Sequence, residues 1–85
     1  MSDLRHFTVE LERPAAGWTE LQRAAARARL AAEQMREEGS EVRFLRSVFV
    51  PEDDACFFLY SSASAAVVDE AVRRAHLGVR SVGDA

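Results

Sequence analysis

Hydrophobic and polar positions alternate along the first part of the chain with the period of a β-strand. Over residues 6–12, one side carries Phe7, Val9 and Leu11, and the other side carries mostly polar residues. Successive side chains of a strand point to opposite faces, so this pattern predicts a strand with one buried face.

A helical pattern follows the first strand. Apolar residues at spacings of three and four predict an amphipathic helix that begins at its N-cap, Thr19, and ends at Gly39. The apolar stripe consists of Leu21, Ala25, Ala28, Ala32 and Met35. A second helix is predicted with Ser62 or Ser64 as its N-cap and with its end at Gly78. Its inward-facing residues are expected to be Val68, Ala71, Val72 and Ala75.

A β-hairpin is predicted between the two helices. Residues 42–50 and 56–60 read as strands joined by an acidic turn at residues 51–55, and residues 79–82 form a last short strand. The order strand, helix, strand, strand, helix, strand is that of the ferredoxin-like βαββαβ arrangement. We therefore predict one α+β domain over residues 1–85, a four-stranded antiparallel sheet with two helices on one face and with the first and third strands in the centre.

The opposite face of this predicted sheet is left without a covering helix. The side chains expected to meet the helices are Phe7, Val9, Leu11, Leu45, Phe49, Phe57 and Leu59. Those expected on the open face are His6, Thr8, Glu10, Phe44, Arg46, Val48, Cys56, Phe58 and Tyr60. Phe44, Val48 and Phe58 would then form an exposed apolar patch, so the sequence predicts a homodimer in which a second copy covers it.

Composition and charge narrow the classes of partner. The net charge of −3 and the pI near 5.3 lack the basic footprint that sequence-independent nucleic-acid binding needs. A single cysteine, with no long apolar run and no signal-peptide pattern, predicts a cytoplasmic protein that does not contact membranes. A chain of 85 residues has a small core, so burial by a second copy would help to stabilise it.

Arg46 is the most informative polar residue, because it lies in the middle of a mostly apolar strand. A charge beside Phe44 and Val48 needs an acceptor, and Glu10 is predicted on the same face. The two could form an ion pair at the dimer interface; alternatively, Arg46 could bind an anionic group while Glu10 acts as a base. The candidate ligand-binding residues are Arg46, Glu10, Thr8, Phe44, Phe58 and Tyr60. The candidate catalytic residues are Glu10, His6 and Tyr60.

The candidate metal ligands are His6, Cys56 and His76, with Glu10 and Glu12 as oxygen donors. Their spacing matches no compact metal motif, so a site would have to be assembled from separate strands or from two subunits. Simpler interpretations are a buried strand residue for Cys56 and a histidine at a helix C-terminus for His76. The sequence shows no phosphate loop, nucleophile–base pair or cofactor motif.

Three segments resemble a family of small ferredoxin-like proteins formerly of unknown function, one branch of which is nickel-binding. They are residues 10–17 with their Pro-Gly segment, the hairpin Val42–Tyr60 with Cys56 after its acidic turn, and the following Ala-Ser-Ala helix with Glu70. The resemblance implies a dimeric ferredoxin-like fold and, in some members, bound nickel or another divalent metal. The family's Glu-His-Ala triplet reads Glu70-Ala71-Val72 here, which implies weak or no specific nickel binding.

Three functional hypotheses from different classes follow. The first is a small dimeric binding protein that holds a metal ion or a small organic ligand against the open face. The second is a cofactor-free enzyme of the dimeric α+β-barrel type, performing acid–base chemistry on an apolar substrate. The third is a structural or regulatory interaction module. A pocket on the open face favours the first two, and a packed interface favours the third.

Overall fold

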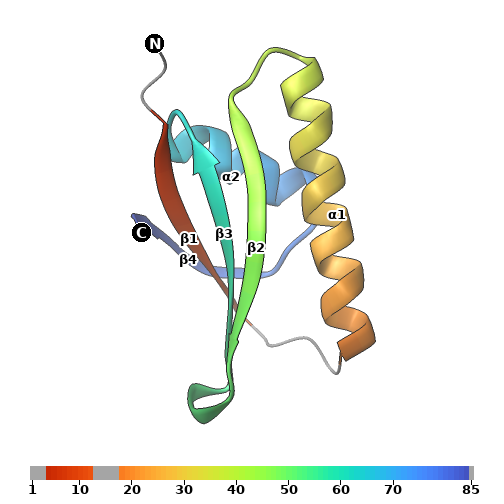
Figure 1. Cartoon of the computed structure of the whole chain (residues 1–85), viewed down its shortest axis with the longest axis vertical. Coiled ribbons are helices and arrows are strands. Elements are labelled where there is room, and N and C mark those ends of the chain that lie inside the picture. The colour runs from red at the N-terminus through yellow and green to blue at the C-terminus, as the bar shows by residue number, and fades with distance from the viewer. Residues whose placement is uncertain (1–3, 13–17, 85) are drawn as a thin grey trace.

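The structure of the chain, a computed structural model, describes residues 4–12 and 18–84. Its elements follow the predicted order (Figure 1): β1 (Arg5–Leu11), α1 (Trp18–Glu37), β2 (Val42–Val50), the short 3-10 turn η1 (Pro51–Asp53), β3 (Ala55–Ser62), α2 (Ala65–Arg74) and β4 (Val79–Asp84). The Pro-Gly segment at residues 13–17 lies outside the described residues.

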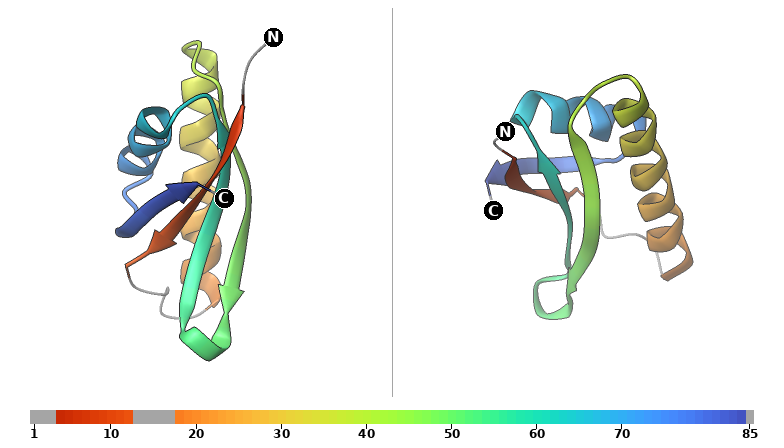
Figure 2. Two further views of the ribbon diagram at one scale, coloured as in Figure 1. Left: turned by 90° about the vertical axis from the view of Figure 1, so that its left-hand side faces the viewer. Right: turned by 45° about the horizontal axis from the view of Figure 1, so that its top comes forward.

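The four strands form one sheet in the order β2-β3-β1-β4, and every neighbouring pair is antiparallel. The prediction that the first and third strands occupy the centre is therefore confirmed. Both helices lie on the same face of the sheet, as the edge-on view in Figure 2 shows. The ferredoxin-like α+β fold is confirmed, and neither of the described helices lies on the second face of the sheet.

Helix α1 begins at Trp18, so Thr19 lies in the first turn of the helix and not at the predicted cap. The helix ends as predicted, with Gly39 in the left-handed region at φ 102°. The amides of Gly39 and Ser40 donate to the carbonyls of Arg36 and Met35 at 3.0 and 2.9 Å. This pair of bonds satisfies carbonyls that a helix end would otherwise leave without donors.

Helix α2 starts at the predicted cap but ends earlier than predicted. The Ser64 side chain accepts a hydrogen bond from the Val67 amide at 3.3 Å, as an N-cap should. The helix ends at Arg74, and His76 takes the left-handed position at φ 56° that Gly39 takes after α1. The predicted end at Gly78 was wrong because a histidine, not a glycine, makes the turn.

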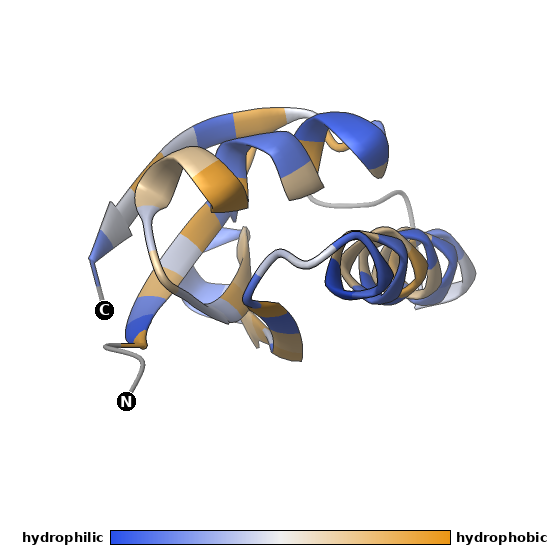
Figure 3. Ribbon diagram, turned by 90° about the horizontal axis from the view of Figure 1, so that it is seen from above, coloured by the Kyte–Doolittle hydropathy of each residue, from blue (hydrophilic) through white to orange (hydrophobic). Residues whose placement is uncertain are grey.

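The hydrophobic core lies between the sheet and the two helices. The predicted inward residues of α2 are all buried, and in α1 Ala24 and Ala31 join the predicted stripe while Ala25 is only half-buried. Figure 3 shows hydrophobic and hydrophilic segments following one another around α1, which is seen nearly end-on. The largest fully buried side chains are Tyr60, Phe7 and Phe58.

The faces of β3 are the reverse of those predicted. Phe58 lies opposite Val9 and Tyr60 opposite Phe7 in the strand register, and directly opposed residues share a face. Because Phe7 and Val9 face the helices, Phe58 and Tyr60 do so too, and both are fully buried. Cys56 is buried on the same face, whereas residues 57 and 59 point to the open face.

A bulge in β2 accounts for a second difference from the prediction. Phe44 lies opposite Tyr60, but the register then shifts, and Arg46 lies opposite Leu59. The extra residue, Leu45, lets Phe44 face the helices while Arg46 and later alternate residues face the open side. Leu45, predicted beneath the helices, is 43% exposed.

Phe49 was also predicted to be covered by the helices. It lies opposite Cys56 and so shares the helix-covered face, but it is 50% exposed. The tip of the hairpin extends past the N-terminal end of α1 in Figure 1, which leaves this part of the strand with little cover.

Candidate functional site

The candidate ligand-binding site was predicted on the open face of the sheet. The register aligns Arg46, Leu59 and Thr8 in one row across β2, β3 and β1, and it aligns Val48, Phe57 and Glu10 in the next. Apolar side chains of this face are exposed or half-buried, and four of them lie in or beside these two rows. We call them the open-face patch: Leu45, Val48, Phe57 and Leu59.

Charged residues flank the open-face patch on both sides. Arg46 lies on the edge strand β2, and Glu10 lies on β1, so β3 separates them. Adjacent strands are about 4.8 Å apart, which places the two backbones about 10 Å from each other. The carboxylate of Glu10 instead lies 3.8 Å from the guanidinium of Arg80 on β4. An ion pair of Glu10 with Arg46 is absent among the described residues of the single chain.

Three predicted ligand-binding residues, Phe44, Phe58 and Tyr60, are not on the open face. The ring of Phe44 meets those of Phe58 and Tyr60 edge-on, with centroids 5.1 and 5.6 Å apart. The guanidinium of Arg29, from α1, lies over the Phe44 ring at 5.1 Å from its centroid. This cluster belongs to the core beneath α1, so that part of the predicted site was wrong.

Tyr60 is also unsuited to the catalytic role that the sequence suggested. Its side chain is fully buried, and its hydroxyl has no hydrogen-bond partner among the described residues. Burial raises the pKa of the Tyr60 phenol above its ordinary value, because the charged form would be poorly solvated. A neutral phenol enclosed in the core cannot exchange protons with a substrate on the open face.

We expect Tyr60→Phe to leave the free energy of unfolding at pH 7 unchanged or to raise it by up to about 1 kcal/mol. The reason is that a buried hydroxyl without a partner costs desolvation and returns no hydrogen bond. Urea denaturation followed by circular dichroism measures the difference. A loss of stability well above 1 kcal/mol would show that the hydroxyl is bonded and would contradict this account.

The stability of Tyr60→Phe should also differ from that of wild type at high pH. Since burial raises the pKa of Tyr60 in the folded state, the unfolded chain releases this proton first, near pH 10. Wild type should therefore lose stability as the pH rises above about 10, and Tyr60→Phe should lose less. Burial also raises the pKa of the Cys56 thiol, but this residue is present in both proteins.

The predicted metal ligands do not meet. His6 lies on the open face of β1 opposite Ser61, whereas Cys56 is buried on the other face of the sheet. His76 lies in the turn after α2, next to the strand end where the amide of Glu12 donates to the carbonyl of Gly78 at 2.8 Å. Over residues 4–12 and 18–84, no three His, Cys, Asp or Glu side chains are grouped to hold a metal ion. The predicted metal ligands of one chain, all of them among the described residues, therefore do not form a nickel site.

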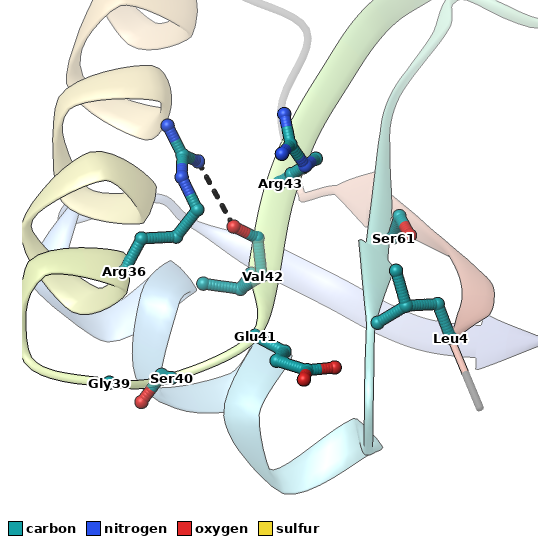
Figure 4. Close-up of a pocket in the computed structure, with 8 residues that line it drawn as sticks. All are labelled: Leu4, Arg36, Gly39, Ser40, Glu41, Val42, Arg43 and Ser61. Atoms are coloured by element: carbon teal, nitrogen blue, oxygen red, sulfur yellow. Dashed lines mark hydrogen bonds between the residues drawn. The ribbon is translucent and has the colours of Figure 1, made fainter. Parts of the chain in front are cut away.

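A pocket of about 390 Å³ lies at the end of the sheet where α1 leads into β2 (Figure 4). The guanidinium groups of Arg36 and Arg43 extend toward the same side of it, and the Glu41 carboxylate lies at the other end. Arg36 donates to the Val42 carbonyl at 3.0 Å, so this arginine already has a structural partner. A second pocket, of about 190 Å³, lies between α1 and the turn before β4. None of the predicted site residues lines the first pocket, and Glu12, a candidate oxygen donor for a metal, lines the second.

Sequence reasoning missed three members of the open-face patch and the partner of Glu10. Leu45, Phe57 and Leu59 were placed beneath the helices, although their side chains face the open side. The pairing of β4 with β1 was implied by the predicted topology, and that pairing brings Arg80 close to Glu10. Topology was thus the signal that could have found Arg80.

No family model matches the chain, and no curated protein matches it. The resemblance to the small ferredoxin-like family with a nickel-binding branch therefore stays a prediction. In the described part of the chain, neither helix has the length and the apolar composition that crossing a membrane requires.

Proposed function

We propose that this protein is a homodimeric interaction module whose two copies pack through the open faces of their sheets. The observation that carries this proposal is the open-face patch: Leu45, Val48, Phe57 and Leu59, which no described element covers. Two sheets that pack face to face lie about 10 Å apart and interleave side chains of this kind. A second copy would thus remove from water the apolar residues that the helices leave uncovered.

The size of the molecule is compatible with such an interface. A stable protein–protein interface covers about 800 Å² of each partner. The chain has an accessible surface of 5408 Å², so the interface would take roughly one seventh of it. The sheet face that the described helices leave open spans four strands.

The molar mass in solution tests the proposal directly. We expect light scattering at micromolar concentration to give twice the chain mass of 9.4 kDa, which is 18.8 kDa. Dilution should shift the mass toward that of one chain as the dimer dissociates. A mass of one chain throughout, up to millimolar concentration, would rule out the homodimer.

A small organic anion is the second candidate occupant of the same face. Arg46 favours it, because this residue lies opposite Leu59 of the patch in the strand register and forms no ion pair among the described residues. The probe is 1-anilinonaphthalene-8-sulfonate, which combines an apolar body with a negative charge. Saturable fluorescence enhancement by a monomeric protein, lost in Arg46→Met and kept in Arg43→Met, would favour ligand binding over self-association.

A further inference from the structure

We infer that, in the proposed dimer, Arg46 of each copy pairs with the partner's Glu10. This inference rests on the proposed function and adds to it the orientation of the two copies. It is based on the positions of Arg46 and Glu10, which lie beside the open-face patch on opposite sides of β3.

The arrangement of charges selects one way of stacking the sheets. Phe57 and Leu59, the centre of the patch, lie on β3, with Arg46 on the strand to one side and Glu10 on the strand to the other. A twofold axis parallel to β3 places β2 of one copy over β1 of its partner. Arg46 then faces the row of the partner's Thr8, and its long side chain reaches the next residue on that face, the partner's Glu10.

The alternative stacking brings like charges together. A twofold axis perpendicular to the strands places β2 over the partner's β2 and β1 over the partner's β1. Arginine side chains would then share one side of the interface and glutamates the other, without neutralising each other. Electrostatic complementarity of this kind commonly fixes the relative orientation of two surfaces. The charges therefore favour the axis parallel to β3.

Arg46 also needs an acceptor once the face is covered. A charge enclosed in an interface is costly unless it is paired and hydrogen-bonded. Glu10 is the one acidic residue among the described strand positions that face the open side. Its present contact with Arg80 spans 3.8 Å, and the Arg80 side chain is 65% exposed, so this contact is weak and easily replaced.

Exchanging the two charges tests the pairing. We expect Arg46→Glu and Glu10→Arg each to weaken the homodimer at least tenfold, because each places like charges at both symmetry-related contacts. An equimolar mixture of the two variants should form a heterodimer of nearly wild-type affinity, since both contacts are then complementary. The chain that carries both substitutions should recover its own homodimer for the same reason. Sedimentation equilibrium and native mass spectrometry measure these species.

Arg43→Glu is the matched control, because Arg43 lies on the same strand and the same face but one row away. The Arg43→Glu protein should have nearly the dimer affinity of wild type and should not preferentially form a heterodimer with Glu10→Arg. Circular dichroism confirms that each variant is folded. If wild type dimerises and the two single variants dimerise equally well, or fail to recombine, the pairing is wrong and the dimer stands. If wild type is monomeric, the proposed function and the pairing both fail.

Discussion

Phe58→Ala is expected to lower the free energy of unfolding by about 3–5 kcal/mol, because it leaves a cavity in the centre of a small core. Phe58 is fully buried, lies opposite Val9, and meets the Phe44 ring edge-on. The total stability of a domain is typically about 5–15 kcal/mol, so the variant should be largely unfolded or melt far below wild type. Thermal and urea denaturation monitored by circular dichroism measure the loss.

This experiment also distinguishes the two possible orientations of β3. Had Phe58 been on the open face, its removal would leave the fold intact and would affect only self-association. A well-folded Phe58→Ala protein that no longer dimerises would therefore contradict the placement of this residue in the core.

Phe57→Gln should have the opposite consequences, although Phe57 is the next residue along the chain. Phe57 lies on the open face between Val48 and Glu10, at the centre of the proposed interface. Removing a central aromatic residue from an interface typically costs about 2 kcal/mol or more, which corresponds to a dissociation constant about 30-fold higher. Sedimentation equilibrium measures the dimer, and the unfolding transition should change little.

Leu30→Gln provides the control for Phe57→Gln. Leu30 is 55% exposed on α1, which covers the other face of the sheet. Losing this apolar side chain should leave the dissociation constant unchanged. Equal weakening of the dimer by both substitutions would show that the open-face patch is not the specific interface.

The order and the approximate bounds of the elements could be predicted because their signals are local. Ser64 caps α2 through its own side chain, and Gly39 ends α1 because it tolerates the left-handed conformation. The acidic turn after Val50 likewise closes the hairpin where expected. Six elements in this order allow few arrangements, so the topology followed from them.

The faces of β3 could not be predicted from alternation. Both sets of alternating residues are apolar, with Cys56, Phe58 and Tyr60 on one side and Phe57 and Leu59 on the other. A one-residue shift in register exchanges the two sets, and only the pairing with β1 decides between them. The aromatic part of the predicted ligand site was therefore wrong, while its Arg46, Glu10 and Thr8 lie on the open face as predicted.

The bulge in β2 has no clear signal in the sequence either. Alternation from Phe44 would place Arg46 and Val48 on the same side as Phe44, and Leu45 gives no indication that it is the additional residue. The prediction nevertheless placed Arg46 on the open face, because it assigned Phe44 there as well. The wrong face for Phe44 and the missed bulge at Leu45 thus cancelled each other, and the predicted face of Arg46 was correct.

The hydrogen bond from Arg36 to the Val42 carbonyl bears on how far the protein can polymerise. β2 is an edge strand, and its outward backbone groups could template the addition of strands from further molecules, which leads to fibres. A strand arriving at the start of β2 would first have to displace the guanidinium from this carbonyl. Association through the open face ends with one partner, whereas strand addition at an edge can continue from molecule to molecule. Arg36 thus hinders the formation of fibres through β2 and does not hinder the formation of a dimer through the open face.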